Sequence, residues 1–229
     1  MESLSSELYQ QPQTGFHDIT RRAFMLIMTF CVALNIGVAA FGAALTHDIE
    51  FTNKWLYFGF VILFMCVSIA GAVWAQSNDD PTTSVIGGFI CAAGMGAMCG
   101  PFISMFTTQS ILQAFVISAG IVLLTGFIGA GLPKDLKMWG APLFAGLIGL
   151  ILLYFAAPIL GFLGFNYDIV ITVLDYAGIL LFCGIMVYDL NQAQRMDRTM
   201  NNAIDVAVNV FLNFANIFLR VLSVMGEKK

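Results

Sequence analysis

The sequence predicts an all-α integral membrane protein with seven transmembrane helices, the last helix central and wrapped by the other six. Of its 229 residues, 59% are hydrophobic and 10% are charged, whereas a soluble domain has about 25% charged residues. The mean hydropathy is +0.86, and apolar runs of about twenty residues are typical of spanning helices. The net charge of −4 argues against a nucleic-acid partner. The lipid bilayer is therefore the expected environment.

Residues 1–20 are polar and predict a cytoplasmic tail, and residues 21–229 predict a single seven-helix transmembrane domain. The first apolar run is longer than the core of a signal peptide, so we interpret it as a span. Turn sequences such as QSNDDPTT separate the later runs. The predicted spans cover residues 23–46, 55–75, 84–106, 110–130, 139–160, 167–188 and 203–224.

The third span is rich in small residues and includes Gly96 and Gly100, four positions apart. Small residues at this spacing allow two helices to approach closely, so we favour a packing face over a role in conduction. Pro101 follows directly, and it predicts a break or a kink in the helix.

The last span carries a regular polar stripe within an apolar run. At about 100° per residue, its five members fall within roughly an 80° arc of one helix face: Asp205, Asn209, Asn213, Asn216 and Arg220. The opposite side carries three aromatic residues, Phe211, Phe214 and Phe218. A charge at the centre of a bilayer costs at least about 2.5 kcal/mol. The stripe is therefore expected to face protein or water.

Two interpretations of the stripe remain open. Each asparagine is consistent with an interhelical hydrogen bond that contributes about 1 kcal/mol. Five polar residues in register, with ionisable residues at both ends, are equally consistent with a polar pathway.

Two aspartates of the sixth span share a face. Asp175 and Asp189 are fourteen residues apart, which places them within about 40° of each other and about 21 Å apart along the axis. Both side chains can therefore face the polar stripe of the last span. The alternatives are a solvated acid at the helix end for Asp189 and a packing role for Asp175.

The sequence offers no catalytic constellation. Tyr188–Asp189 is similar to one half of the intramembrane aspartyl protease motif, but the seventh span lacks the matching GxGD. The predicted spans contain no histidine for a serine protease, and the last span has no lysine for retinal. We expect no enzymatic activity, no cofactor and no tight metal site.

Basic residues predict the orientation. The loops on the side of the N-terminus contain six of them, Arg21, Arg22, Lys134, Lys137, Arg195 and Arg198, whereas those on the other side contain Lys54. Positive charge is enriched in cytoplasmic loops. We therefore expect the N-terminus in the cytoplasm and the C-terminus outside.

Three motifs carry a resemblance to a known family: GAMCGPFI at residues 96–103, YDLNQ at 188–192 and AVNVFLNFANIFL at 207–219. With these motifs the chain resembles the Bax inhibitor-1 family, also called the transmembrane BAX-inhibitor-motif family, over almost its whole length after the tail. The resemblance implies a central last helix and a pH-sensitive calcium leak, here in a bacterial inner membrane. In the family, two aspartates share a proton, one on each of the last two helices, and this pair senses pH.

The chain departs from this pattern at the sensing pair. The first aspartate maps onto Asp189, but the second maps onto Asn213, a neutral amide. We therefore expect a calcium leak that depends weakly on pH and passes the ion transiently along Asp175, Asn209, Asn213 and Asp189. The alternative is a non-enzymatic modulator of a membrane-bound quality-control protease, as some bacterial members are, with the N-terminal tail as the contacting part.

Overall fold

The computed structural model describes residues 19–77 and 79–229, which form seven long α-helices and one short 3₁₀ helix. Each of the seven is long and apolar enough to cross a membrane, which confirms the predicted fold class. The predicted cytoplasmic tail lies outside the described residues except for its last two positions. The elements are α2 (Arg21–Thr46), α3 (Lys54–Gln76), α4 (Pro81–Ile103), α5 (Thr108–Gly131), η1 (Lys137–Trp139), α6 (Gly140–Phe162), α7 (Tyr167–Ala193) and α8 (Met200–Met225).

Six of the seven helices begin at a polar side chain that accepts a hydrogen bond from a backbone N–H of the first turn. Such caps satisfy donors that have no partner within the helix. At α4, the hydroxyl and the N–H of Thr83 both donate to Asp80, which lowers the pKa of this carboxyl group. The six capping residues are Thr20, Asn53, Asp80, Thr107, Asn166 and Thr199.

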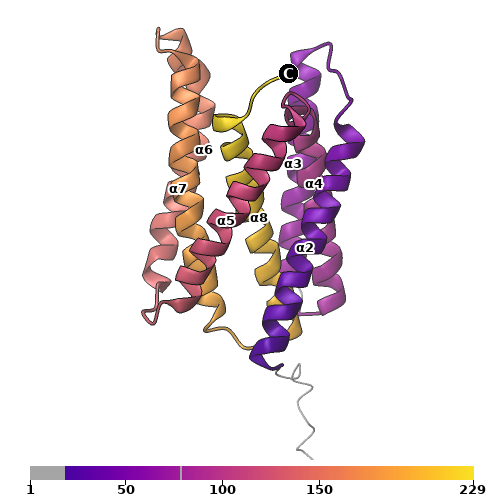
Figure 1. The fold of residues 1–229 in the computed structure, drawn as a ribbon, viewed down its shortest axis with the longest axis vertical. Coiled ribbons are helices and arrows are strands. Elements are labelled where there is room, and N and C mark those ends of the chain that lie inside the picture. The colour runs from indigo at the N-terminus through magenta and orange to yellow at the C-terminus, as the bar shows by residue number, and fades with distance from the viewer. Residues whose placement is uncertain (1–18, 78) are drawn as a thin grey trace, which may run out of the picture.

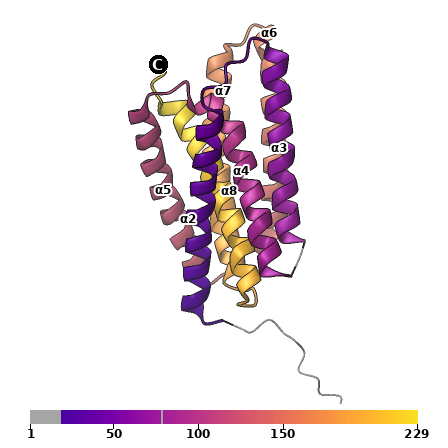
Figure 2. The same cartoon turned by 90° about the vertical axis from the view of Figure 1, so that its right-hand side faces the viewer.

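Two helices, α4 and α8, share the interior of the bundle. In their most apolar stretches 56% of α4 and 50% of α8 is buried, against 11–28% in the other five helices. Helix α8 packs against α2, α4, α5 and α7, while α6 packs mainly on α7. Figure 1 shows α5 crossing obliquely over α8, and Figure 2 shows α8 between α2 and α4. The predicted wrapping of the last helix by all six others is thus not confirmed.

The glycines of α4 bring this helix close to α2. A Cβ atom at Gly96 would overlap the backbone carbonyl of Ala39, and one at Gly100 would overlap Thr46. Contacts of this kind require residues without a side chain. Both glycines therefore form the packing face that the sequence predicts.

Of the two outcomes predicted for Pro101, a break or a kink in α4, the break does not occur. The helix continues past it to Ile103. A proline has no N–H for the carbonyl four residues earlier, which here belongs to Ala97. The hydroxyl of Thr46 on α2 donates to that carbonyl at 2.9 Å and so replaces the missing bond. A donor from a neighbouring helix explains why the helix persists.

The six basic residues counted above lie at one end of the bundle, which we call the basic end. Hydrogen bonds there join the start of α2 to the loop after α7, from Arg21 to Gln194 and from Ile19 to Arg198. The C-terminus lies at the opposite end (Figure 1), where Lys229 donates to Met105 at 2.9 Å. We call this the C-terminal end.

The glycine contact between α2 and α4 predicts a stability difference. Gly96→Ala should lower stability by about 1–3 kcal/mol, because the added methyl group overlaps backbone that must move. Gly37→Ala is the matched control, since nothing lies within 4 Å of its Cβ position, and alanine favours a helix over glycine by about 1 kcal/mol. Thermal unfolding of the detergent-solubilised variants measures both effects. Equal unfolding midpoints for Gly96→Ala and Gly37→Ala would contradict close packing at Gly96.

Candidate functional site

The central contact of the candidate site joins α7 to α8. The amide Nδ2 of Asn213 donates to Oδ2 of Asp189 at 2.7 Å, and it also lies 3.8 Å from the sulfur of Met186. Asn213 is 4% exposed and Asp189 is half-buried. The juxtaposition predicted from the sequence is therefore present. An amide donates a hydrogen bond but has no proton to share, so the pair contains a single titratable group.

The position of Asp189 depends on Asn191, two residues further along α7. Asn191 is fully buried, and its Nδ2 donates to the carbonyls of Leu132 and Lys134, both at 3.1 Å. Its Oδ1 accepts the N–H of Leu136 at 3.0 Å. A single side chain thus satisfies the backbone of the loop between α5 and α6 and fixes the end of α7 against it.

Gln192 adds a second contact between the end of α7 and the loop between α5 and α6, at the surface. Its Nε2 donates to Asp135 at 3.0 Å, and the N–H of Lys137 donates to the same carboxylate oxygen at 2.8 Å. These hydrogen bonds, first that of Gln192, hold the pKa of Asp135 below its usual value, with a smaller contribution from the charge of Arg195. The motif at residues 188–192 therefore combines one candidate site residue with two residues that position it.

Toward the basic end, the stripe faces α3 and α4. Gln76 of α3 donates to Asn209 at 3.1 Å. Asp205 is half-buried and accepts from Asn201 at 3.0 Å, and Asn201 accepts from Ser84 of α4 at 2.8 Å. This part of the stripe is a polar network at the contact of three helices. Neither Gln76 nor Ser84 stands out in the sequence, because each is one polar residue near a helix end.

Asp175 forms a second buried constellation near the C-terminal end. It is 5% exposed, and its two oxygens accept from the hydroxyls of Tyr154 at 2.5 Å and Ser223 at 2.6 Å. Ser223 continues the spacing of the stripe, three residues after Arg220, and this signal could have identified it. Tyr154 gave no signal because its span is uniformly apolar.

Arg220 and Asn216 lie between these two constellations. One guanidinium nitrogen of Arg220 donates to both the carbonyl and the side-chain oxygen of Asn216, each at 3.0 Å. The guanidinium lies 4.8 Å from the ring centroid of Phe182 and 5.6 Å from that of Tyr154. Favourable cation–π contacts have distances of this kind. The direct contacts of the guanidinium are thus with neutral groups, and the Asp175 carboxylate acts on it at longer range.

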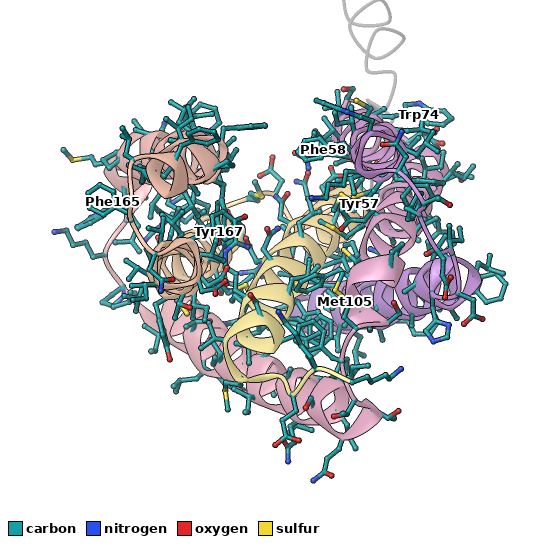
Figure 3. The ribbon with its side chains drawn as sticks, turned by 90° about the horizontal axis from the view of Figure 1, so that it is seen from above. Tyr57, Phe58, Trp74, Met105, Phe165 and Tyr167 are labelled. Atoms are coloured by element: carbon teal, nitrogen blue, oxygen red, sulfur yellow. The ribbon has the colours of Figure 1, made fainter. Side chains whose placement is uncertain are left out.

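A cavity of about 320 Å³ adjoins the Asp175 constellation. In Figure 3, seen from above, α8 lies between the α6–α7 pair and the α3–α4 pair, and Tyr57 of α3 is labelled on the far side of α8 from Tyr167. Polar and apolar side chains from both pairs and from α8 line the cavity. They are Tyr57, Val61, Met98, Cys99, Phe102, Tyr154, Ile171, Asp175, Leu219, Arg220 and Ser223.

The opposite side of α8 lines a groove of about 490 Å³, which α2, α4 and α5 complete. Phe211 is buried there, and Phe214 and Phe218 both contact Phe115 of α5 edge to face. Apart from His47, the lining is apolar. The predicted separation of a polar and an aromatic side on the last helix is therefore present.

Within residues 19–77 and 79–229, no three His, Cys, Asp or Glu residues lie together as in a tight metal site. The constellations instead pair one carboxylate with neutral oxygens and amides. Such a set can hold a cation transiently, because hard oxygen ligands suit calcium but a high affinity needs several of them around the ion.

Comparison with known proteins identifies the family. The family model described as "Inhibitor of apoptosis-promoting Bax1" matches residues 20–229. The inner membrane protein YbhL of Escherichia coli K12 is 24% identical over 98% of this chain and 97% of its own length. An uncharacterized protein of Caulobacter vibrioides is 27% identical over 93% of this chain and 91% of its own. With the motifs at residues 188–192 and 207–219 in contact across α7 and α8, the chain belongs to the Bax inhibitor-1 family.

Proposed function

We propose that the protein is a cation leak pathway through the membrane, with calcium as the ion, and that the Asp189–Asn213 contact controls it. The observation that carries this proposal is the hydrogen bond of 2.7 Å between these two residues in the middle of a polar stripe. On one side of it lies the Asp175 constellation, and on the other the network around Asp205. The stripe therefore supplies polar groups along most of α8.

An ion would enter beside Asp175, pass Arg220, Asn216 and the Asp189–Asn213 pair, and leave along Asn209 and Asp205. The direct hydrogen bond between Asp189 and Asn213 closes the path in this conformation. The two side chains contact each other across the path and leave no room for an ion between them. Opening requires α7 and α8 to separate locally. Asp189 then becomes available as a ligand for the cation. Because it is a single carboxylate, it binds the cation weakly and can release it again.

The charge distribution supports an orientation in the membrane. The basic end carries the six basic residues of the predicted cytoplasmic loops, and cytoplasmic loops are enriched in Lys and Arg. The relative YbhL is an inner membrane protein. We therefore place the basic end in the cytoplasm of a bacterium, with the C-terminal end outside the inner membrane.

Asp189→Asn should reduce calcium flux into proteoliposomes to near the background of empty liposomes, because the pair then contains no charge to attract a cation. Asp197→Asn is the control, since this carboxylate is exposed in the loop before α8. Equal flux in wild type and Asp189→Asn would contradict the role of Asp189.

Asn213→Asp should introduce a steep dependence of flux on pH between about 6 and 8, where wild type responds weakly. Two carboxylates at hydrogen-bond distance share one proton, and they repel each other when it is lost. Flux in the variant should therefore rise with pH, as repulsion separates α7 from α8. A wild type already as steep as the variant would show that Asn213 does not remove the sensor.

Deleting residues 2–18 tests whether the tail contributes to the leak. The deletion retains Ile19 and Thr20, which join α2 to the loop after α7 and cap α2. Flux should remain at the wild-type level, since the polar stripe and both constellations lie within the helices. Loss of flux in a deletion variant that folds normally would instead assign the tail to the pathway.

A further inference from the structure

Arg220 is out of place in a pathway for cations. It is the positive charge on a stripe whose other members are one carboxylate and three amides, and it lies between Asp175 and the Asp189–Asn213 pair. A cation moving between these carboxylates must pass it. The way in which the protein holds Arg220 therefore bears on conduction.

A slot on α7 holds the side chain of Arg220. The slot exists because residue 178 is a glycine: a Cβ atom there would overlap Nε and Cδ of Arg220. Phe182, one turn along α7, and Tyr154 of α6 present their rings to the guanidinium. Asn216 accepts two hydrogen bonds from one of its nitrogens. Three helices thus contribute to a fitted site for a single side chain.

Arg220 has no direct ion pair in this slot. The described residues include no carboxylate within ion-pair distance of it, and its buried Nε has no hydrogen-bond partner among them. Asp175 lies nearby, but its two oxygens accept from Tyr154 and Ser223 instead. The Asp175 carboxylate attracts the guanidinium only at longer range, so the positive charge is offset in part and still repels a cation in the polar stripe.

Resting on the proposed function, we propose that Arg220 is a tethered cation that blocks the pathway from its slot against Gly178 and thereby sets how many cations pass. The cavity of about 320 Å³ that Arg220 and Asp175 line together gives the side chain a second position. Moving there, the guanidinium pairs with Asp175, which cancels its charge and unblocks the stripe. The slot and the cavity correspond to the closed and open positions.

Two substitutions test the block by different routes. Arg220→Gln removes the charge, and Gly178→Ala keeps the charge but fills the slot, so that the flexible end of Arg220 must leave it. Arg220→Lys retains a positive charge at the same position. Gly149→Ala on α6 is the control for a new methyl group in a span, because nothing lies within 4 Å of its Cβ position.

Calcium flux into proteoliposomes is measured for each variant, with thermal unfolding and size exclusion to establish that it folds. Arg220→Gln should raise flux at least about tenfold, since a partly buried unit charge strongly disfavours a nearby divalent ion. Gly178→Ala should also raise flux, whereas Arg220→Lys and Gly149→Ala should stay near wild type. Adding Gly178→Ala to Arg220→Gln should not raise the flux further, because the charge of Arg220 is already absent from the slot.

Flux in Arg220→Gln at or below the wild-type level, with wild type clearly above empty liposomes, would overturn the block while leaving the proposed leak intact. If Arg220→Gln does not fold, unchanged flux in Gly178→Ala overturns it in the same way. Background flux in wild type and in every variant would instead refute the leak itself. Background flux in wild type together with flux above background in Arg220→Gln would support a complete block by Arg220.

Discussion

The hydrocarbon core of the membrane imposes the constraint on which this structure depends: polar groups inside the spans must find their partners within the protein. Helix α8 carries a stripe of these groups, and their partners decide where the helix lies. Asn209 bonds to α3 through Gln76, and Asn213 bonds to α7 through Asp189. Because these partners lie on opposite halves of the bundle, α8 is held between them. Its aromatic side is then left to pack against α2, α4 and α5.

The contact between Asp189 and Asn213 could be predicted because each residue belongs to a motif and to a regular helix face. Burial was harder to predict. Helix α4 is as buried as α8, since residues such as Gly96 allow α2 to approach to backbone contact. Small residues in a sequence indicate close packing, but they do not indicate how many helices pack there. The arrangement of one central helix was therefore not predictable from the stripe alone.

Interactions between helices explain the other differences from the sequence predictions. Local rules predict a break or a kink at Pro101, but the helix continues past it, because a hydroxyl from α2 supplies the bond that the proline lacks. The slot of Arg220 needs a glycine on α7, two rings from different helices and an amide on its own helix. Asn216 shares the polar stripe with Arg220, but nothing in the other two spans marks the glycine or the rings. Such a site exists only once the helices are assembled, so no spacing within one helix reveals it.

The substitution of asparagine for the second aspartate separates two roles that an acid pair combines. One role is to hold α7 against α8, which needs a hydrogen bond between the helices. The other is to exchange a proton, which needs two carboxylates. Asn213 keeps the first role, because its amide donates to Asp189 at 2.7 Å, and it abandons the second. Asn191 and Gln192 anchor the end of α7 through the loop between α5 and α6 in either case. The geometry of the site therefore does not depend on its proton chemistry, and the contact between α7 and α8 is present with a single carboxylate.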